Sequence, residues 1–188
     1  MKRRMKKRLP RFMSSFSKRE RKGDIWVETV IYTLIALTMM GLVLAFVVPK
    51  IDEIQDKSVI EQSVNLMKDM NNVILSVVQG GPGNKRLVEA TIKKGTLIID
   101  GPENKTVFEM ETDYVYSEPG TEISIGNINA KTEKIGGTNK VTLTTYYDYE
   151  IVPNEIRRIE HSTTPYIITI ENTGESEDGK TKVDISVT

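Results

Sequence analysis

The chain has 188 residues, no cysteine and one histidine, and its 26 basic and 26 acidic residues give a formal net charge of zero. The absence of cysteine excludes disulfides, thiolate catalysis and cysteine-based metal sites, and a single histidine excludes a histidine cluster within one chain. The length suits one modest domain plus an additional segment.

The balanced total hides a strong asymmetry along the chain. Residues 1–23 hold eleven of the basic residues and one of the acidic ones, which leaves fifteen basic and twenty-five acidic residues in 24–188. The twenty residues 29–48 carry no charge, a length that matches a hydrocarbon core of about 30 Å. Because Lys and Arg beside a span stay inside, we expect a single-pass membrane protein with a cytoplasmic N-terminus. Nucleic-acid binding by the basic segment is a less favoured alternative.

One carboxylate, Glu28, lies at the start of this apolar run. A charge inside a membrane helix costs about 2.5–3.5 kcal/mol on insertion scales, so Glu28 should lie near the interface or have a partner. The run is apolar on all sides, which is typical of a membrane helix. A secretory signal peptide is not favoured. Such a peptide has a shorter apolar region than this chain, and a small-residue cleavage site follows that region, which this chain lacks after Val48.

Residues 49–79 should form an amphipathic helix. Pro49 should kink or interrupt the helix as it leaves the bilayer, because proline cannot donate a backbone hydrogen bond. Apolar residues then recur at three- and four-residue steps, a spacing that predicts a helix with one buried face. These residues are Ile60, Val64, Met67, Ile74 and Val78, with Val59, Leu66, Met70, Val73 and Val77 beside them. Charged residues, Asp56 among them, occupy the other positions. Gly80-Gly81-Pro82-Gly83 should end the helix.

Residues 84–188 have the composition of a β-rich head. We expect a hairpin of 87–93 and 96–100, strands over 106–116, 122–128 and 140–152, and a last hairpin of 166–171 and 181–187. The apolar face of the sheet needs cover, and the amphipathic helix supplies it. The expected fold class is α+β: a long N-terminal membrane-spanning helix continues as an amphipathic helix that packs on a C-terminal antiparallel β-sheet head.

No catalytic, cofactor-binding or metal site is predicted. His161 is expected in an exposed loop, and Glu109 and Glu111 alternate along a strand as a solvated face would. The glycine-rich loop 80–85 ends a helix, where phosphate-binding loops begin one. Tyr146, Tyr147 and Tyr149 are expected to pack on the sheet, with an adhesive patch as the less favoured alternative.

Asn104-Lys105-Thr106 is an N-glycosylation sequon in a predicted turn. A turn of an outward-facing domain is the right place for one, but sequons also occur by chance. Asn104 is therefore a possible glycosylation site.

A basic leader ending in Lys22-Gly23, four intervening residues, Glu28 and a long apolar helix together resemble the prepilin signature of type IV pilins. The resemblance covers 18–78 in architecture, and the long leader and β-rich head are most similar to the archaeal branch. No motif in the head matches. The archaeal flagellar filament proteins usually lack the glutamate, so Glu28 argues against that subgroup.

The resemblance implies that a membrane prepilin peptidase cuts after Gly23 on the cytoplasmic side, so that Asp24 becomes the first residue of the mature chain. Residues 1–23 would be the leader, 24–48 the transmembrane and assembly helix, 49–79 the amphipathic helix and 84–188 the extracellular head. The helix would pack against other pilin subunits, as a homo- or hetero-polymer, in a cell-surface filament. Glu28 would pair with the terminal amine of a neighbouring subunit and set the axial register.

Two positions depart from the family pattern. Asp24 stands where the family more often has an apolar or small first residue, which indicates a minor or initiating subunit. Pro49 lies slightly beyond the usual position of a helix-breaking proline. The alternative function is a non-polymerising, membrane-anchored extracytoplasmic domain that acts as a binding or accessory module. An enzyme is not expected, since no nucleophile–base constellation is present.

Overall fold

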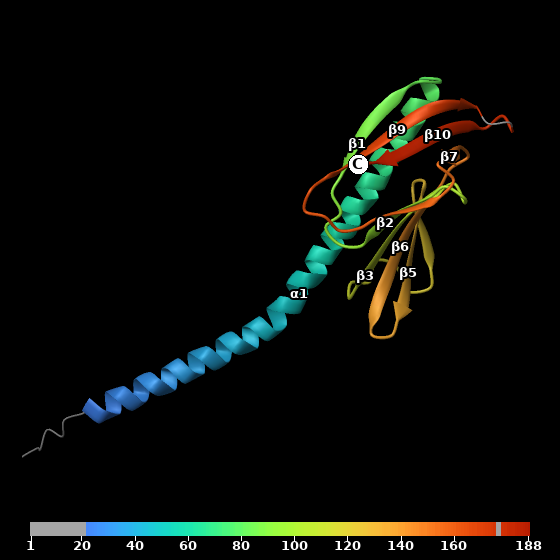
Figure 1. The fold of residues 1–188 in the computed structure, drawn as a ribbon. Helices are drawn as coiled ribbons and strands as arrows, with labels where there is room; N and C mark the ends of the chain where they lie inside the picture. The colour runs from blue at the N-terminus through green and yellow to red at the C-terminus, as the bar shows by residue number, and fades with distance from the viewer. Residues whose placement is uncertain (1–21, 176–177) are drawn as a thin grey trace, which may run out of the picture. The chain divides into compact units, whose positions relative to one another are not determined.

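A computed structural model describes residues 22–175 and 178–188 (Figure 1). The chain divides into two units, Met1–Val47 and Val48–Thr188, and one helix, α1 (Lys22–Gln79), crosses the boundary between them. The predicted basic leader lies outside the described residues except for its last two, Lys22 and Gly23, whose backbone belongs to the first turn of α1.

Helix α1 continues through Pro49 without a break. The expected interruption at Pro49 is therefore wrong, whereas a kink there stays a prediction. Proline removes one backbone hydrogen bond, and the cooperativity of the long helical stretches on both sides outweighs that local loss. The predicted end of the helix at the glycine-rich segment is correct. The Gly80 N–H donates to the Ser76 carbonyl at 3.0 Å. The next residue, Gly81, has a φ of 81°, a backbone conformation that is costly for a residue with a β-carbon.

Strands make up most of the second unit after α1. Their bounds are β1 Lys85–Ala90, β2 Thr96–Asp100, β3 Lys105–Thr112, β4 Glu122–Ile125, β5 Ile128–Ile135, β6 Thr138–Tyr146, β7 Glu150–Val152, β8 Ile156–Ile159, β9 Tyr166–Glu175 and β10 Thr181–Val187. The strands form two sheets, ordered β1-β9-β10-β7 and β4-β5-β6-β3-β2-β8. All neighbours are antiparallel except β10 and β7, which are parallel.

This arrangement confirms the α+β fold class, with an apolar N-terminal helix and a mainly antiparallel β-rich head. The last hairpin is also correct, since β9 and β10 pair antiparallel. The single sheet of the prediction is replaced by two.

The predicted hairpin of 87–93 and 96–100 is wrong. Strand β1 pairs with β9 in one sheet, whereas β2 pairs with β3 and β8 in the other, so the intervening residues carry the chain between sheets. Gly95 marks this crossing: its φ is 90°, and a β-carbon on it would lie 2.6 Å from the Glu109 carbonyl oxygen. The glycine permits a close approach to the neighbouring strand, and it does not form a hairpin turn.

Two predicted strands each turn out to be two. The segment 122–128 is β4, a turn at Gly126 and Asn127, and the first residue of β5, with Ile125 opposite Ile128. The segment 140–152 contains most of β6 and then β7, and residues 147–149 lie between them. Strand β8 has no counterpart in the prediction. Gly126-Asn127 is a dipeptide typical of a two-residue hairpin turn, which accounts for the division of 122–128.

The amphipathic part of α1 buries its predicted face. The buried apolar side chains of α1 are Ile60, Val64, Met67, Met70, Ile74 and Val77. They belong to one hydrophobic cluster that also contains residues from strands of both sheets. Full burial of such a side chain is worth about 1.5–3 kcal/mol. This part of the helix is thus an integral element of the head's core.

Candidate functional site

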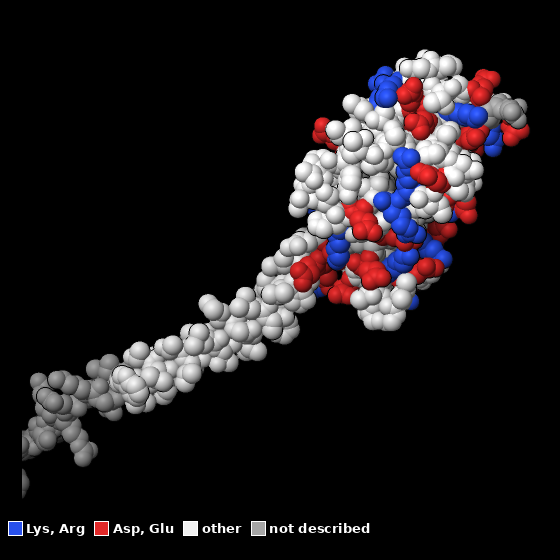
Figure 2. Space-filling model, viewed as in Figure 1, with Lys and Arg blue, Asp and Glu red and all other residues white. Residues whose placement is uncertain are grey.

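The first candidate site is the apolar stretch of α1 that precedes the head. Its large apolar side chains from Trp26 to Val48 are between 38% and 75% exposed, whereas the charged side chains visible among the described residues in Figure 2 lie on the second unit. In length and composition α1 is able to cross a membrane. A core helix of a soluble domain would bury its apolar side chains, and this stretch buries none of them within the chain. It therefore needs a cover from outside, either lipid or protein.

Polar groups within this stretch are arranged for an apolar surrounding. The hydroxyl of Thr33 donates to the Thr29 carbonyl, and that of Thr38 donates to the Leu34 carbonyl, each at 2.8 Å. An unsatisfied hydroxyl would cost free energy in hydrocarbon. Both threonines are therefore compatible with lipid or with a packed helix bundle.

Glu28 is exposed on α1, beside a surface hollow of about 310 Å³ that Val27, Ile31 and Tyr32 also line. Gly23 and Asp24 lie in the first turn of the same helix, so positions 24 and 28 are about one turn apart along its backbone. Glu28 makes no ion pair with another described residue. The partner that a carboxylate in an apolar helix needs is not supplied from the described part of the chain.

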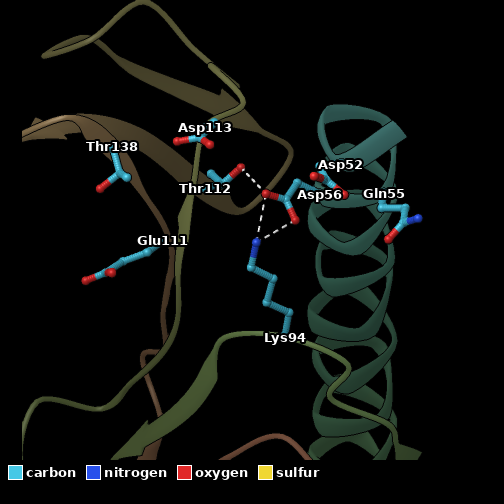
Figure 3. A pocket seen from close by; sticks show the side chains of 8 residues that line it. All are labelled: Asp52, Gln55, Asp56, Lys94, Glu111, Thr112, Asp113 and Thr138. Atoms are coloured by element: carbon cyan, nitrogen blue, oxygen red, sulfur yellow. Dashed lines mark hydrogen bonds and ion pairs between the residues drawn. The ribbon is translucent and has the colours of Figure 1, made fainter. Parts of the chain in front are cut away.

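The second candidate site is a cleft of about 360 Å³ in the head, between α1 and the end of β3 (Figure 3). Asp56 lies at its centre, with 12% of its side chain exposed. Its two carboxylate oxygens accept hydrogen bonds from Lys94 at 2.7 and 2.8 Å, and one of them accepts from the Thr112 hydroxyl at 2.6 Å. Asp56 is thus a buried link between α1 and the strands.

The sequence predicts Asp56 on the solvent-facing side of α1, and this prediction is wrong because the residue is buried. A signal was present, since Asp56 lies four residues before Ile60 and so continues the buried stripe by one turn. The spacing of apolar residues alone predicts the buried face of α1. It therefore does not identify a buried carboxylate whose lysine partner lies far along the chain. Lys94 and Thr112 come from segments 38 and 56 residues further along the chain.

Further acidic residues line the same cleft, but they do not form a metal site. Asp52, Glu111 and Asp113 stand around it without a bond to Asp56 (Figure 3). Among the described residues no three acidic or histidine side chains are close enough together to hold a metal ion. With its central carboxylate fully engaged by Lys94 and Thr112, the cleft is a packing feature of the head.

Asn104 occupies a tight turn with a structural role of its own. Its φ is 49°, and its side-chain oxygen accepts a hydrogen bond from the Ile151 N–H at 2.8 Å. Thr106, the third sequon residue, is fully buried, and its hydroxyl lies 3.0 Å from the Tyr147 hydroxyl. Asparagine is among the few residues that adopt a positive φ readily. The turn therefore accounts for Asn104 structurally, and glycosylation stays a prediction.

The remaining candidates have ordinary structural roles. Tyr147 and Tyr149 pack against the core as expected, and burial raises the pKa of Tyr147 to about 12, whereas Tyr146 is exposed. His161 is exposed, as predicted, and its Nδ1 lies 3.1 Å from the Ile92 carbonyl oxygen. Glu109 pairs with Lys140 at 3.0 Å on a solvated sheet face.

No family model matches the chain, and no curated protein or solved structure matches it.

Proposed function

We propose that the chain is the precursor of a type IV pilin-like structural subunit. A prepilin peptidase removes the leader after Gly23, and the subunit joins a cell-surface filament, with a role in adhesion or surface attachment. Before assembly the subunit resides in the cell membrane as a single-pass protein with its N-terminus in the cytoplasm. The proposed partners are the peptidase, other pilin subunits and the membrane, with no nucleic acid involved.

One observation carries the proposal. The apolar stretch Trp26–Val48 exposes all its large side chains and has a single carboxylate, Glu28, five residues after Gly23. Cleavage at this glycine creates a terminal amine at Asp24, one helical turn from Glu28. In a bundle of such helices the carboxylate of one subunit pairs with the amine of another, which offsets the desolvation of both charges and specifies register. A plain membrane anchor has no use for this spacing.

Asp24, the first residue of the mature chain, bears on the role of the subunit in the filament. Asp24 places a second carboxylate one turn from Glu28, and like charges at this spacing repel each other. A filament built throughout from such subunits would repeat this repulsion at every layer. The proposed role is therefore a minor or initiating subunit.

The second candidate function is a non-polymerising anchored domain with a binding or accessory role. It is favoured by the head, which is complete in itself, with one core that unites α1 and both sheets. Such a head needs a tether, and it does not need a filament. In that case Glu28 is a carboxylate at the membrane interface.

The deciding experiment is identification of the N-terminus in cells with and without a prepilin peptidase. Intact-mass and N-terminal sequencing of the membrane-extracted chain should show Asp24 as the first residue in the first cells and Met1 in the second. A Gly23→Val variant should keep its leader in both. Retention of Met1 in peptidase-containing cells would contradict the proposal.

A matched pair of variants separates filament subunit from anchor. Glu28→Gln should be cleaved normally and should be lost from the sheared filament fraction. Thr29→Val, next to it, should be cleaved and incorporated like the unmodified chain. Equal recovery of the two variants in that fraction would favour an anchor function, in which Glu28 has no assembly role.

A further inference from the structure

The six-stranded sheet has a hollow of about 330 Å³ on the face that points away from the core. Val141 and Leu143 of β6 belong to the core cluster. The alternate residues Thr142, Thr144 and Tyr146 therefore face the other way, and all three line the hollow. Its volume lies within the range of about 300–1,000 Å³ that is typical of small-molecule sites. The hollow is therefore large enough for a small ligand.

The strand register gives the hollow its shape. Thr142 lies between Glu109 of β3 and Lys131 of β5, and Thr144 lies beside Asn129 of β5. Short threonine side chains thus form the floor, and longer side chains of the neighbouring strands form the walls. Because strands hold side chains more precisely than loops do, the hollow is a preformed site.

The charges in the walls already pair with each other. Lys140 contacts Glu109 at 3.0 Å, and Lys131 contacts Glu133 at 2.7 Å. Glu122, the register partner of Lys131, adds one more carboxylate. A charged ligand would compete with these pairs. A hydroxyl bonds to them without separating them, since it donates to a carboxylate and accepts from an ammonium. The walls therefore favour a neutral ligand that is rich in hydroxyls.

Polar groups of the floor are available to such a ligand. The Thr142 and Thr144 hydroxyls make no hydrogen bond with another described residue. The Asn129 side-chain oxygen accepts from the Ser124 hydroxyl at 3.2 Å, and no described residue accepts a hydrogen bond from its amide N–H groups. The hollow thus offers hydrogen-bond donors and acceptors side by side.

Tyr146 adds an apolar surface to this polar lining. Its side chain is 64% exposed, whereas Tyr147 and Tyr149 pack against the core. A tyrosine ring on a rigid strand presents a flat apolar face at little cost in conformational entropy, which is why such rings often anchor a ligand or partner. A pyranose ring fits this combination, because one of its faces carries C–H groups and its edge carries hydroxyls.

We propose that this hollow binds a neutral oligosaccharide. One sugar ring stacks on Tyr146, and its hydroxyls bond to Thr142, Thr144 and the paired charges of the walls. The inference rests on the proposed adhesive role and names the class of ligand that the head recognises. It does not require a filament, because the head of an anchored domain has the same hollow.

The full-length chain in phosphatidylcholine nanodiscs, produced in a host without N-glycosylation, tests this inference. The discs contain no sugar headgroup, and the host excludes competition by a glycan on Asn104. The probes are an array of neutral oligosaccharides of glucose, galactose, mannose and N-acetylglucosamine. Sialylated and sulfated oligosaccharides and oligolysine are the charged probes, and empty discs are the blank.

At least one neutral probe should bind. The best one is then titrated by saturation-transfer NMR, in which the C–H hydrogens of one sugar ring should receive most of the saturation. Binding of no neutral probe would overturn the inference. Tighter binding of a charged probe that depends on Tyr146 would also overturn it, because the ligand class would then be wrong.

Two substitutions of Tyr146 separate the ring from its hydroxyl. Tyr146→Ala should weaken binding of the best neutral probe roughly tenfold, because the stacking surface is lost. Tyr146→Phe keeps the ring and should bind within about threefold of the unmodified chain. Leu87→Ala is the matched control on the other sheet, since Leu87 is 63% exposed, and it should leave the affinity unchanged. Equal affinities of Tyr146→Ala and Leu87→Ala would contradict the proposed site.

Thr144→Val tests the floor, since it keeps the shape of the side chain and removes the hydroxyl. It should weaken binding about three- to tenfold through the loss of one hydrogen bond. Thr169→Val, at a half-buried position beside Leu87 on the other sheet, is the control and should have no effect. Equal affinities of these two valine variants would contradict the role of the floor in binding.

The salt dependence of binding tests the charge of the ligand. Affinity for a neutral saccharide should change less than about twofold between low and high salt, because there is no ligand charge to screen. A strong decrease in affinity with salt would assign the hollow to a charged ligand and overturn the inference.

Saccharide binding and cleavage after Gly23 can fail independently. Retention of Met1 in peptidase-containing cells contradicts the filament proposal and leaves saccharide binding by the head in place. A mature chain that begins at Asp24 and binds no neutral probe overturns the inference and leaves the filament proposal standing.

Discussion

Asp56 of α1 binds the ammonium of Lys94 through both carboxylate oxygens, at 2.7 and 2.8 Å. The Thr112 hydroxyl donates to the same carboxylate at 2.6 Å, and the Tyr114 N–H donates to Thr112 Oγ1 at 2.9 Å. One helix position thus joins the crossing between β1 and β2 to the end of β3. This is the point at which the head's core begins along α1, since Ile60 is the next residue on the same face.

Replacement of Asp56 by alanine should therefore destabilise the head. It leaves the buried Thr112 hydroxyl without its acceptor and Lys94 without its carboxylate, and loss of such a charged hydrogen-bond partner costs about 1–3 kcal/mol. Denaturant unfolding of the full chain in detergent, followed by far-ultraviolet circular dichroism, measures the change. Asp56→Asn keeps an acceptor for Thr112, and its stability should lie between those of the alanine variant and the unmodified chain.

The control for Asp56 is Glu53→Ala on the same helix. Glu53 pairs with Lys50 at 2.7 Å, but both side chains are largely exposed. Exposed pairs contribute about 0–1 kcal/mol. A loss of stability in Glu53→Ala as large as that in Asp56→Ala would show that burial of the Asp56 carboxylate is not what matters.

Two adjacent residues of α1 test the helix's role in the core. Ile74 is 1% exposed and Leu75 is 37% exposed. Ile74→Ala should cost about 2–5 kcal/mol because it leaves a cavity in a packed core. Leu75→Ala should cost about 1 kcal/mol or less, since its site is open to solvent. The unfolding midpoints of the two variants measure the difference, and similar values would contradict the assignment of the buried face.

The sequence predicted the helix well because its evidence is local. The uncharged run 29–48 and the three- and four-residue steps after Pro49 each repeat within a few turns. The pairing of β1 was not accessible in this way, since its partner β9 follows about eighty residues later. A turn signal at Lys94-Gly95 marks a change of direction, and it does not tell which strand comes alongside.

The polar link at Asp56 illustrates the same limit in the candidate site. The sequence predicts Asp56 on the solvent-facing side because it is charged, and only the fold brings Lys94 and Thr112 to it. By contrast, Gly23, Asp24 and Glu28 form a local pattern that the sequence displays completely. The sequence does not identify a basic partner for the Glu28 carboxylate. The described part of one chain does not contain an ion-pair partner for it either.

Asn104 stabilises a tight turn, and it is also the predicted glycosylation site. Substitutions can separate these two roles. Asn104→Asp keeps an oxygen for the Ile151 N–H and tolerates the positive φ of 49°, but it cannot be glycosylated. We expect Asn104→Asp to keep most of the head's stability. Asn104→Ala should lose about 1–3 kcal/mol through the lost hydrogen bond and backbone strain.

The same variants address the sequon. Intact mass of the chain from a host that glycosylates exported proteins should fall by one glycan in Asn104→Asp if the sequon is used. Lys105→Arg retains the sequon and serves as the control for expression and processing. An identical mass, apart from the substitution, in Asn104→Asp would assign Asn104 to the turn alone.

Tyr147 makes the stability of the head depend on pH in the alkaline range. Burial raises its pKa from 10.0 to about 12, and its hydroxyl lies 3.0 Å from that of Thr106. A group whose pKa is raised on folding stabilises the protein below the unfolded pKa, and this contribution is lost as the pH rises to the folded pKa. The free energy of unfolding should therefore fall between about pH 10 and 12, by up to about 2–3 kcal/mol, at 1.36 kcal/mol per pKa unit.

Tyr147→Phe should remove most of this alkaline dependence, and Tyr146→Phe, which changes an exposed hydroxyl, should leave it in place. The Tyr147→Phe variant should also be less stable at neutral pH by about 1 kcal/mol, because Thr106 loses its hydrogen-bond partner. A smaller slope persists, since burial also raises the pKa of Tyr116. Denaturant unfolding at about pH 8, 10 and 12, which cover the range from below the unfolded pKa of Tyr147 up to its folded pKa, measures all three effects. An equally steep alkaline loss in Tyr147→Phe and the unmodified chain would assign the dependence to another group and leave Tyr147 as a packing residue.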